Sequence, residues 1–245
     1  MASSDQIVRA LLQTIESRDL RAISERLHPE ASWQNVPHPA SEGREAVLSL
    51  LAGILCWSDA VRWDITSCTS SGDTAWFERV DRFWIDGEEY AVPCNGVFSV
   101  DLDAGTVVSV RDYVDLGEWR QRIESVYLRL AARTASEVVA RHLVAVEGRD
   151  PVAMAADYAL DATLEREHRQ YRGWFAIADY FDTVPGRLSG RPLTFSPIEA
   201  INESEASVDW RIGAESEAVA TGTDRYEVRD GRIVYQHTQI HGADF

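Results

Sequence analysis

Residues 76–84 read W-F-E-R-V-D-R-F-W and combine the aromatic side chains of a buried strand with four charges. Successive side chains of a strand point to opposite faces of its sheet. The residues that share one face are then Phe77, Arg79, Asp81 and Phe83. That face holds one guanidinium and one carboxylate between two phenylalanines. Burying charge is costly unless it is paired, so an inward position predicts an ion pair with a specific task.

A second carboxylate stands in the segment T-V-V-S-V-R-D-Y-V at 106–114. Counting in twos puts Asp112 on the same face as Val108 and Val110. If this face and the Arg79 face point into one cavity, two carboxylates flank one guanidinium, whose fork of donors can hold both. Coupled carboxylates titrate at different pH values, which leaves one acid and one base near neutral pH. Such a pair can take a proton from water while it protonates a leaving oxygen.

An arginine and an aspartate two residues apart on a strand also occur as a surface ion pair, and spacing alone leaves that alternative open. If the pair is internal, its apolar neighbours line a substrate pocket. The pocket-lining residues predicted in this way are Phe77, Phe83, Val108 and Val110.

The chain repeats itself, which indicates two copies of one fold. Three pairs of similar segments begin at offsets of 131, 130 and 126 residues, and the join falls near residues 130–135. The pairs are 16–35 with 147–166, 41–54 with 171–184, and 103–110 with 229–236.

Each copy is expected to contain helices followed by a run of antiparallel strands, the pattern of an α+β fold. A curved sheet wrapped around three helices encloses an apolar cavity of the kind that holds small ligands. The long strands of the first copy, separated by Gly and Asp turn signals, are expected at 61–69, 74–84, 89–101 and 106–114.

The charge balance excludes several functions. The 245 residues carry a formal net charge of −16, which argues against nucleic acid and against anionic membranes as partners. All 24 basic residues are arginine, so lysine Schiff-base chemistry and a lysine-dependent phosphate loop are excluded.

The three cysteines are odd in number and form no C-x-x-C pair, which favours a reducing cytoplasm over a disulfide framework. We expect neither a signal peptide nor a membrane-spanning run. His168, His237 and His241 lack the spacing of a metal site, so no metal or other cofactor is expected.

The first copy resembles limonene-1,2-epoxide hydrolase and its relatives, a branch of the nuclear-transport-factor-2-like superfamily. The resemblance implies a cone-shaped α+β barrel, with three helices on a curved mixed or antiparallel sheet, and one-step epoxide opening without a metal or a covalent intermediate. It spans about residues 5–125 and rests on WQNVPHP (33–39), GREAV (43–47), ERVDRF (78–83), GVFSV (96–100) and RDYVDLGEW (111–119).

Carried over residue by residue, the resemblance implies that Asp112 is the base that activates water and that protonated Asp81 donates to the epoxide oxygen. Arg79 bridges and orients both. Asn35 and Trp33 take the two positions that hold the water in the family, although the family has Tyr where Trp33 stands. An indole only donates a hydrogen bond, whereas a phenol also accepts one, so the water site departs from the pattern.

The second copy, residues 134–245, resembles the SnoaL-like polyketide-cyclase branch through YRGWFAIADYF and GTDRYEVRDGRIVYQ. Aligning the final turns puts Thr238 at the place of Asp112 and Arg166 opposite Asn35. Because no Asp–Arg–Asp triad results, we expect this copy to be non-catalytic. It is expected to pair with the catalytic copy, residues 1–130, as an intramolecular pseudo-dimer that can associate further into a homodimer.

The sequence thus predicts a cofactor-independent epoxide hydrolase that converts a small hydrophobic epoxide of secondary metabolism into a vicinal diol. Two alternatives stay open. Relatives in polyether biosynthesis open epoxides with a substrate hydroxyl to form cyclic ethers, and some of them are tandem fusions. The other alternative is a non-enzymatic small-molecule binding protein in which the triad is a structural ion network.

Overall fold

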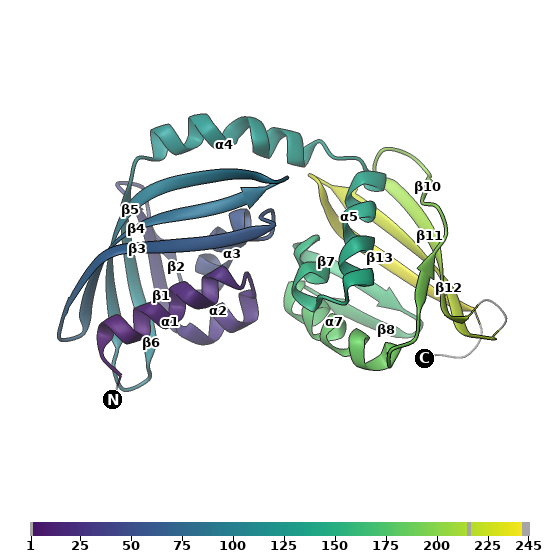
Figure 1. Ribbon diagram of the computed structural model, residues 1–245, viewed down its shortest axis with the longest axis horizontal. Helices are drawn as coiled ribbons and strands as arrows, with labels where there is room; N and C mark the ends of the chain where they lie inside the picture. The colour runs from purple at the N-terminus through teal and green to yellow at the C-terminus, as the bar shows by residue number, and fades with distance from the viewer. Residues whose placement is uncertain (1, 215–216, 242–245) are drawn as a thin grey trace. The chain divides into compact units, whose positions relative to one another are not determined.

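The chain folds into two compact units, Met1–Val126 and Tyr127–Phe245 (Figure 1). The computed structural model describes residues 2–214 and 217–241. Each unit is a curved sheet carrying helices, which confirms the tandem α+β architecture. The division falls within helix α4 (Leu116–Ala131), an element that was not predicted from the sequence.

The first unit places three helices on one side of a six-stranded sheet (Figure 1). The strand order is β2-β1-β6-β5-β4-β3, with β1 parallel to β6 and the other pairs antiparallel. The four long strands predicted from turn signals are confirmed. The elements are α1 (Ser4–Glu16), α2 (Leu20–Arg26), β1 (Leu27–Val36), β2 (Ser41–Glu42), α3 (Arg44–Leu55), β3 (Ala60–Ser71), β4 (Thr74–Ile85), β5 (Glu88–Asp101) and β6 (Thr106–Val114).

The second unit repeats this plan with an added short strand. Its sheet order is β10-β11-β12-β13-β7-β8, with β9 also paired to β11 and β13 parallel to β7. The elements are α5 (Ala135–Gly148), α6 (Pro151–Ala156), β7 (Tyr158–Arg166), β8 (Arg169–Arg172), α7 (Trp174–Leu188), β9 (Leu193–Phe195), β10 (Glu199–Ala200), β11 (Glu205–Ala214), β12 (Glu217–Arg229) and β13 (Arg232–His241).

The repeat is visible in local chemistry as well as in topology. Arg18 and Arg149 both adopt a left-handed backbone, with φ of 60° and 57°. The aspartate that follows each arginine caps the next helix: Asp19 accepts hydrogen bonds from the first backbone N–H groups of α2, and Asp150 does so for α6. The repeated Arg-Asp pair therefore sets the same helix–turn–helix entry in both units.

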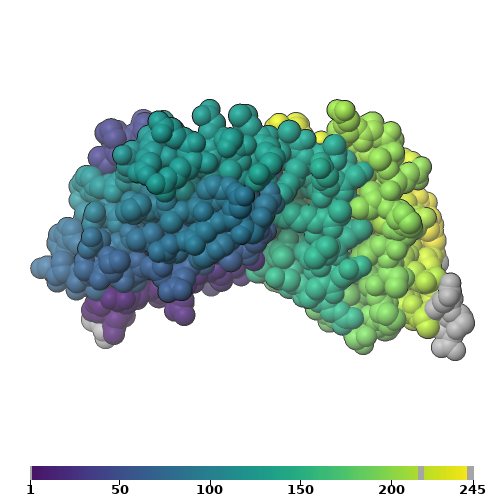
Figure 2. Space-filling model, turned by 45° about the horizontal axis from the view of Figure 1, so that its top comes forward, coloured from purple at the N-terminus to yellow at the C-terminus, as the bar shows by residue number. Residues whose placement is uncertain are grey.

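Each sheet is open in its strand order over the described residues, so the barrel expected from the resemblance is not closed. Helix α1 packs on the first sheet, where it contacts β3, β4, β5 and β6, and its Ile7, Leu11 and Ile15 are buried at helical spacing. The first turns of α4 add to this unit, since Trp119 packs on Phe83 with ring centroids 5.6 Å apart. Figure 2 shows these turns of α4, in teal, against the blue strands of the same unit.

Candidate functional site

Strand β4 alternates regularly between buried and more exposed residues, and the face that carries Arg79 and Asp81 is the buried one. Phe77, Arg79 and Asp81 are 1%, 1% and 6% exposed, whereas Trp76 and Glu78 face solvent. The alternation is kept because the pairing of β4 with β5 has no register shift from Thr74 to Ile85. A fully buried arginine is thus carried into the interior of the first unit.

Strand β6 does not alternate regularly, and this corrects one predicted pocket residue. Its register against β5 shifts between the pairs Ser99–Ser109 and Val100–Val107, so Val108 is an extra, bulged residue. Val107 is fully buried, whereas Val108 is only half-buried. Val108 therefore does not share the inward face of Val110 and Asp112, because the bulge puts Val107 there.

The structure brings the three predicted triad residues together. Arg79 donates to Asp81 through Nε (2.8 Å to Oδ1) and Nη2 (3.2 Å to Oδ2). The same Nη2 donates to Asp112 Oδ2 at 2.9 Å. All three side chains are at least nine-tenths buried. One guanidinium therefore bridges two carboxylates in the interior.

Aromatic rings and one glycine hold the guanidinium in place. Arg79 Cζ lies 4.6 Å from the ring centroid of Trp63 and 5.6 Å from that of Phe98. On the inward face of β5, Gly96 pairs with Asp112. A Cβ at Gly96 would lie 2.4 Å from Arg79 Nη1 and 2.8 Å from Asp112 Oδ1. Only glycine leaves room there for the bridge.

Several polar atoms of the site are buried without a hydrogen-bond partner among the described residues. They are Arg79 Nη1, Asp112 Oδ1 and Trp63 Nε1, two donors and one acceptor. Buried groups of this kind are uncommon in folded proteins and call for a ligand, an ordered water or a chemical role.

The surroundings of Asp81 raise its pKa. Burial raises the pKa of Asp81 to about 7; Arg79 opposes this rise and the charge of Asp112 adds to it. Burial acts to lower the pKa of Arg79, but Asp112 and Asp81 outweigh it and raise that pKa, so the guanidinium stays charged. Near neutral pH a substantial fraction of Asp81 therefore carries a proton, which lowers the negative charge around Arg79.

The residues predicted to position water lie beside Asp112. Trp33 is buried, and its Nε1 donates to Asp112 Oδ2 at 3.0 Å. Its only donor is therefore used on the carboxylate rather than on a water. Asn35 is paired with Asp112 across the parallel strands β1 and β6 and is half-buried.

The predicted apolar lining is otherwise buried around the triad. Phe77 packs on Phe98 with centroids 5.6 Å apart, and Phe83 and Val110 are 5% and 1% exposed. Counting in twos missed Cys94, which lies opposite Arg79 on β5. Burial, followed by the charge of Asp112, raises the pKa of the Cys94 thiol, so a neutral thiol adjoins the triad.

The second unit places its predicted residues as the alignment required. Thr238 pairs with Arg166 across β13 and β7, as Asp112 pairs with Asn35 across β6 and β1. The inward face of β11, at Val208, Trp210 and Ile212, is buried and uncharged. The second interior, over the residues that the structure describes, therefore lacks the Asp–Arg–Asp arrangement.

The second interior does contain a buried acid, Asp224, that was not predicted from the sequence. Asp224 is buried on β12 and accepts a hydrogen bond from the Tyr226 hydroxyl at 3.2 Å. Burial raises the pKa of Asp224. Asp224 pairs with Thr238 in the second sheet, as Gly96 pairs with Asp112 in the first. Asp224 therefore takes the position of Gly96, so a carboxylate in the second unit stands where the first unit has a glycine.

Within residues 2–214 and 217–241, no group of three or more His, Cys, Asp or Glu side chains is arranged to hold a metal ion. Over the same residues no helix is long and apolar enough to cross a membrane.

The chain belongs to the SnoaL-like domain family. The model of this family matches twice, over residues 8–110 and 139–236, which together make up most of the chain. The two units are therefore tandem domains of one family, which the fold and the internal repeat already indicated.

Solved structures of similar fold each match about half of the chain. An LEH-like epoxide hydrolase of M. tuberculosis is 22% identical, covering 48% of this chain and 86% of its own, with a TM-score of 0.43. An NTF2-like protein of unknown function from Burkholderia pseudomallei is 18% identical, covering 49% and 97%, with a TM-score of 0.43. At these identities the likeness concerns the fold alone.

Proposed function

We propose that the first domain is an epoxide hydrolase that adds water to a small hydrophobic epoxide and gives a vicinal diol. The observation that carries the proposal is the buried Asp81–Arg79–Asp112 bridge with its unpartnered Asp112 Oδ1. Oδ2 of Asp112 already accepts from Arg79 and Trp33, so Oδ1 is the oxygen left to take a proton from water. No cofactor takes part in this mechanism.

In the proposed reaction, water attacks one epoxide carbon while Asp112 removes its proton. The carbon–oxygen bond of the ring breaks, and the proton on Asp81 passes to the leaving oxygen. The raised pKa of Asp81, about 7, supports its role as the acid, because a substantial fraction carries a proton at neutral pH. Solvent then returns Asp112 and Asp81 to their starting states, and the net change is addition of one water.

The test is turnover of a panel of terpenoid, styrene and polyketide-type epoxides in oxygen-18 water. The diol should carry the label. Asp112→Asn and Asp81→Asn should each lower kcat by about 10²–10⁴-fold, the usual contribution of a general acid or base. Asp64→Asn is the matched control, because Asp64 is a partly exposed ion-pair partner of Arg82 outside the triad. Near-wild-type rates in either triad variant would falsify the assignment.

A second candidate is an epoxide-opening cyclase that uses a hydroxyl of the substrate in place of water. Trp33 favours it, because the indole N–H donates to Asp112 and offers no acceptor to hold a water. The product would be a cyclic ether without the oxygen-18 label. No turnover of any epoxide, with a change in melting temperature alone in the triad variants, would instead indicate a binding protein.

The pairing of the two domains as a pseudo-dimer belongs to the same proposal. Its support is the tandem family match, since both copies have the same fold. Sedimentation equilibrium should then give the mass of a single chain of 27.4 kDa or of a homodimer of such chains.

A further inference from the structure

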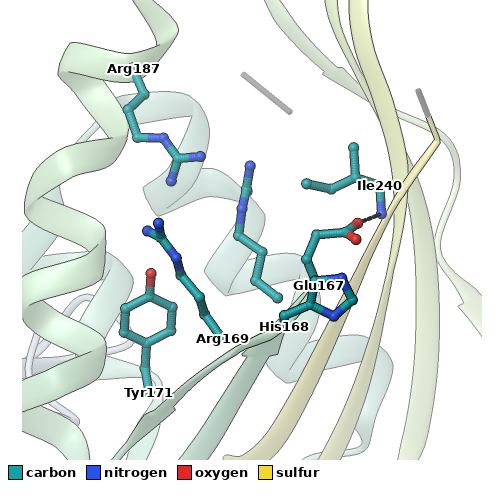
Figure 3. A pocket seen from close by; sticks show the side chains of 7 residues that line it. Glu167, His168, Arg169, Tyr171, Arg187 and Ile240 are labelled. Atoms are coloured by element: carbon teal, nitrogen blue, oxygen red, sulfur yellow. Dashed lines mark hydrogen bonds between the residues drawn. The ribbon is translucent and has the colours of Figure 1, made fainter. Parts of the chain in front are cut away.

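The second domain contains a pocket of about 360 Å³ whose walls are rich in arginine. Figure 3 shows Arg169, Arg187 and Tyr171 turned toward one another in it. Arg187 comes from the end of α7, Arg169 and Tyr171 come from β8, and Arg166 completes the wall from the end of β7. The volume falls within the range usual for small-molecule sites, roughly 300–1,000 Å³.

The charge of this pocket is opposite to that of the chain. Three guanidinium groups and one carboxylate, that of Glu167, line it, so its formal charge is +2 with histidine neutral. The chain as a whole carries −16. The one carboxylate is engaged with the backbone, since Glu167 Oε1 accepts from the N–H of Ile240 at 3.1 Å, as Figure 3 also shows. The pocket therefore concentrates positive charge on an acidic protein.

Two of the three arginines, Arg166 and Arg187, contact the same aromatic residue, Tyr180. Arg166 is 4% exposed and donates through Nη1 to the Tyr180 hydroxyl at 3.1 Å. The Tyr180 ring packs on Tyr171, with centroids 4.9 Å apart, and its centroid lies 5.8 Å from the guanidinium of Arg187. A buried, positioned guanidinium presents its fork of donors in a fixed orientation, which suits a planar or tetrahedral oxyanion.

The first domain has no arginine at the position that matches Arg166. The register of β7 against β13 matches that of β1 against β6, so Arg166 corresponds to Asn35. The next residues, Glu167 and His168, then correspond to Val36 and Pro37. The buried arginine at this register position is thus a feature of the second copy and not a requirement of the shared fold.

We infer that the second domain binds a small organic oxyanion, a carboxylate or a phosphate, among the guanidinium groups of Arg166, Arg169 and Arg187. The apolar part of the ligand lies against Tyr171 and Ile240, which line the same pocket. This site is independent of the triad in the first domain and of the reaction proposed there.

The test is isothermal titration of the full chain at low ionic strength with sodium hexanoate, with inorganic phosphate and with uncharged hexanamide. Saturable binding of hexanoate at one site per chain identifies a carboxylate ligand, and saturable binding of phosphate identifies a phosphate ligand. Either result supports the inference if added sodium chloride weakens binding and hexanamide does not bind. Failure of both anions to saturate below about 10 mM overturns it.

Variants locate the site. Arg169→Gln and Arg187→Gln should each weaken binding by about tenfold or more, the effect of losing one charge-assisted hydrogen bond. Arg172→Gln is the matched control, because Arg172 is exposed on the same strand as Arg169 but outside the pocket. Asp112→Asn should bind the anion as the wild type does, since it alters only the first domain. Unchanged affinity in both pocket variants, or lost affinity in Asp112→Asn, refutes the assignment.

Discussion

Replacing Asp81 with asparagine should change how stability depends on pH, independently of any substrate. Asp81 is buried, and its pKa is raised from 3.8 to about 7. A carboxyl with a raised pKa binds its proton more tightly in the folded chain than in the unfolded chain. Its contribution to stability is therefore fully present below pH 3.8 and is lost as the pH rises through about 7. The amide introduced by Asp81→Asn resembles the protonated acid and does not titrate.

The magnitude follows from the two pKa values. Each unit of difference corresponds to about 1.4 kcal/mol of differential interaction. Between pH 5 and pH 8, the wild type should lose about 2.5 kcal/mol of unfolding free energy relative to Asp81→Asn. The assay is urea unfolding of both proteins at the two pH values, followed by tryptophan fluorescence, because Trp33 and Trp63 lie beside the triad.

Asp64→Asn serves as the control, because the pKa of Asp64 is shifted in the direction opposite to that of Asp81. Hydrogen bonding to Arg82 is the first cause that lowers the pKa of Asp64, so its stabilising effect is lost on acidification rather than at high pH. If the wild type and Asp81→Asn lose the same free energy between pH 5 and pH 8, Asp81 does not hold its proton at neutral pH. The acid role proposed for it then fails as well.

Other substitutions test the surroundings of the triad. Gly96→Ala should lower the free energy of unfolding by about 1–3 kcal/mol and abolish turnover, because its Cβ would lie 2.4 Å from Arg79 Nη1. Gly53→Ala is the control: its Cβ would meet nothing within 4 Å, so thermal unfolding should show neutral or increased stability. Arg79→Ala should lower the free energy of unfolding in urea by about 3–5 kcal/mol, because it leaves two buried carboxylates without their counter-charge. Replacing both carboxylates with amides in the same chain should recover much of that loss. Trp33→Phe should cost about 1.5–3 kcal/mol by removing the N–H donor to Asp112, which chemical denaturation at neutral pH measures.

The sequence predicted best those features that depend on one regular segment. The inward face of β4 followed from counting in twos, because β4 pairs with β5 without a register shift. The same counting failed on β6, where the bulge at Val108 moves Val107 inward. No Gly or Pro marks this bulge, because an extra residue is a property of two strands in register and not of one.

The site residues on β5 and the pocket of the second domain could not be predicted from the sequence, for a related reason. Gly96 and Cys94 matter through what they face across the sheet, and this depends on the register of three strands. The arginine pocket gathers Arg166, Arg169 and Arg187 from separate elements, two of which are joined by a tight turn. Spacing along the chain shows which face of its own strand or helix a side chain lies on. It does not show which faces of different elements meet at one site.

Comparison of the two domains explains how one fold could support the two sites proposed above. The pairing of Gly96 with Asp112 leaves space for the guanidinium to bridge two acids in the first domain. In the second domain Gly222 lies opposite Trp210, and a Cβ there would meet the indole at 2.3 Å. Glycine thus makes room for a guanidinium in one interior and for an indole in the other. With an indole at the position of the bridging arginine, the buried Asp224 accepts a hydrogen bond from the neutral Tyr226 hydroxyl. The second domain instead gathers Arg166, Arg169 and Arg187 around the pocket described above.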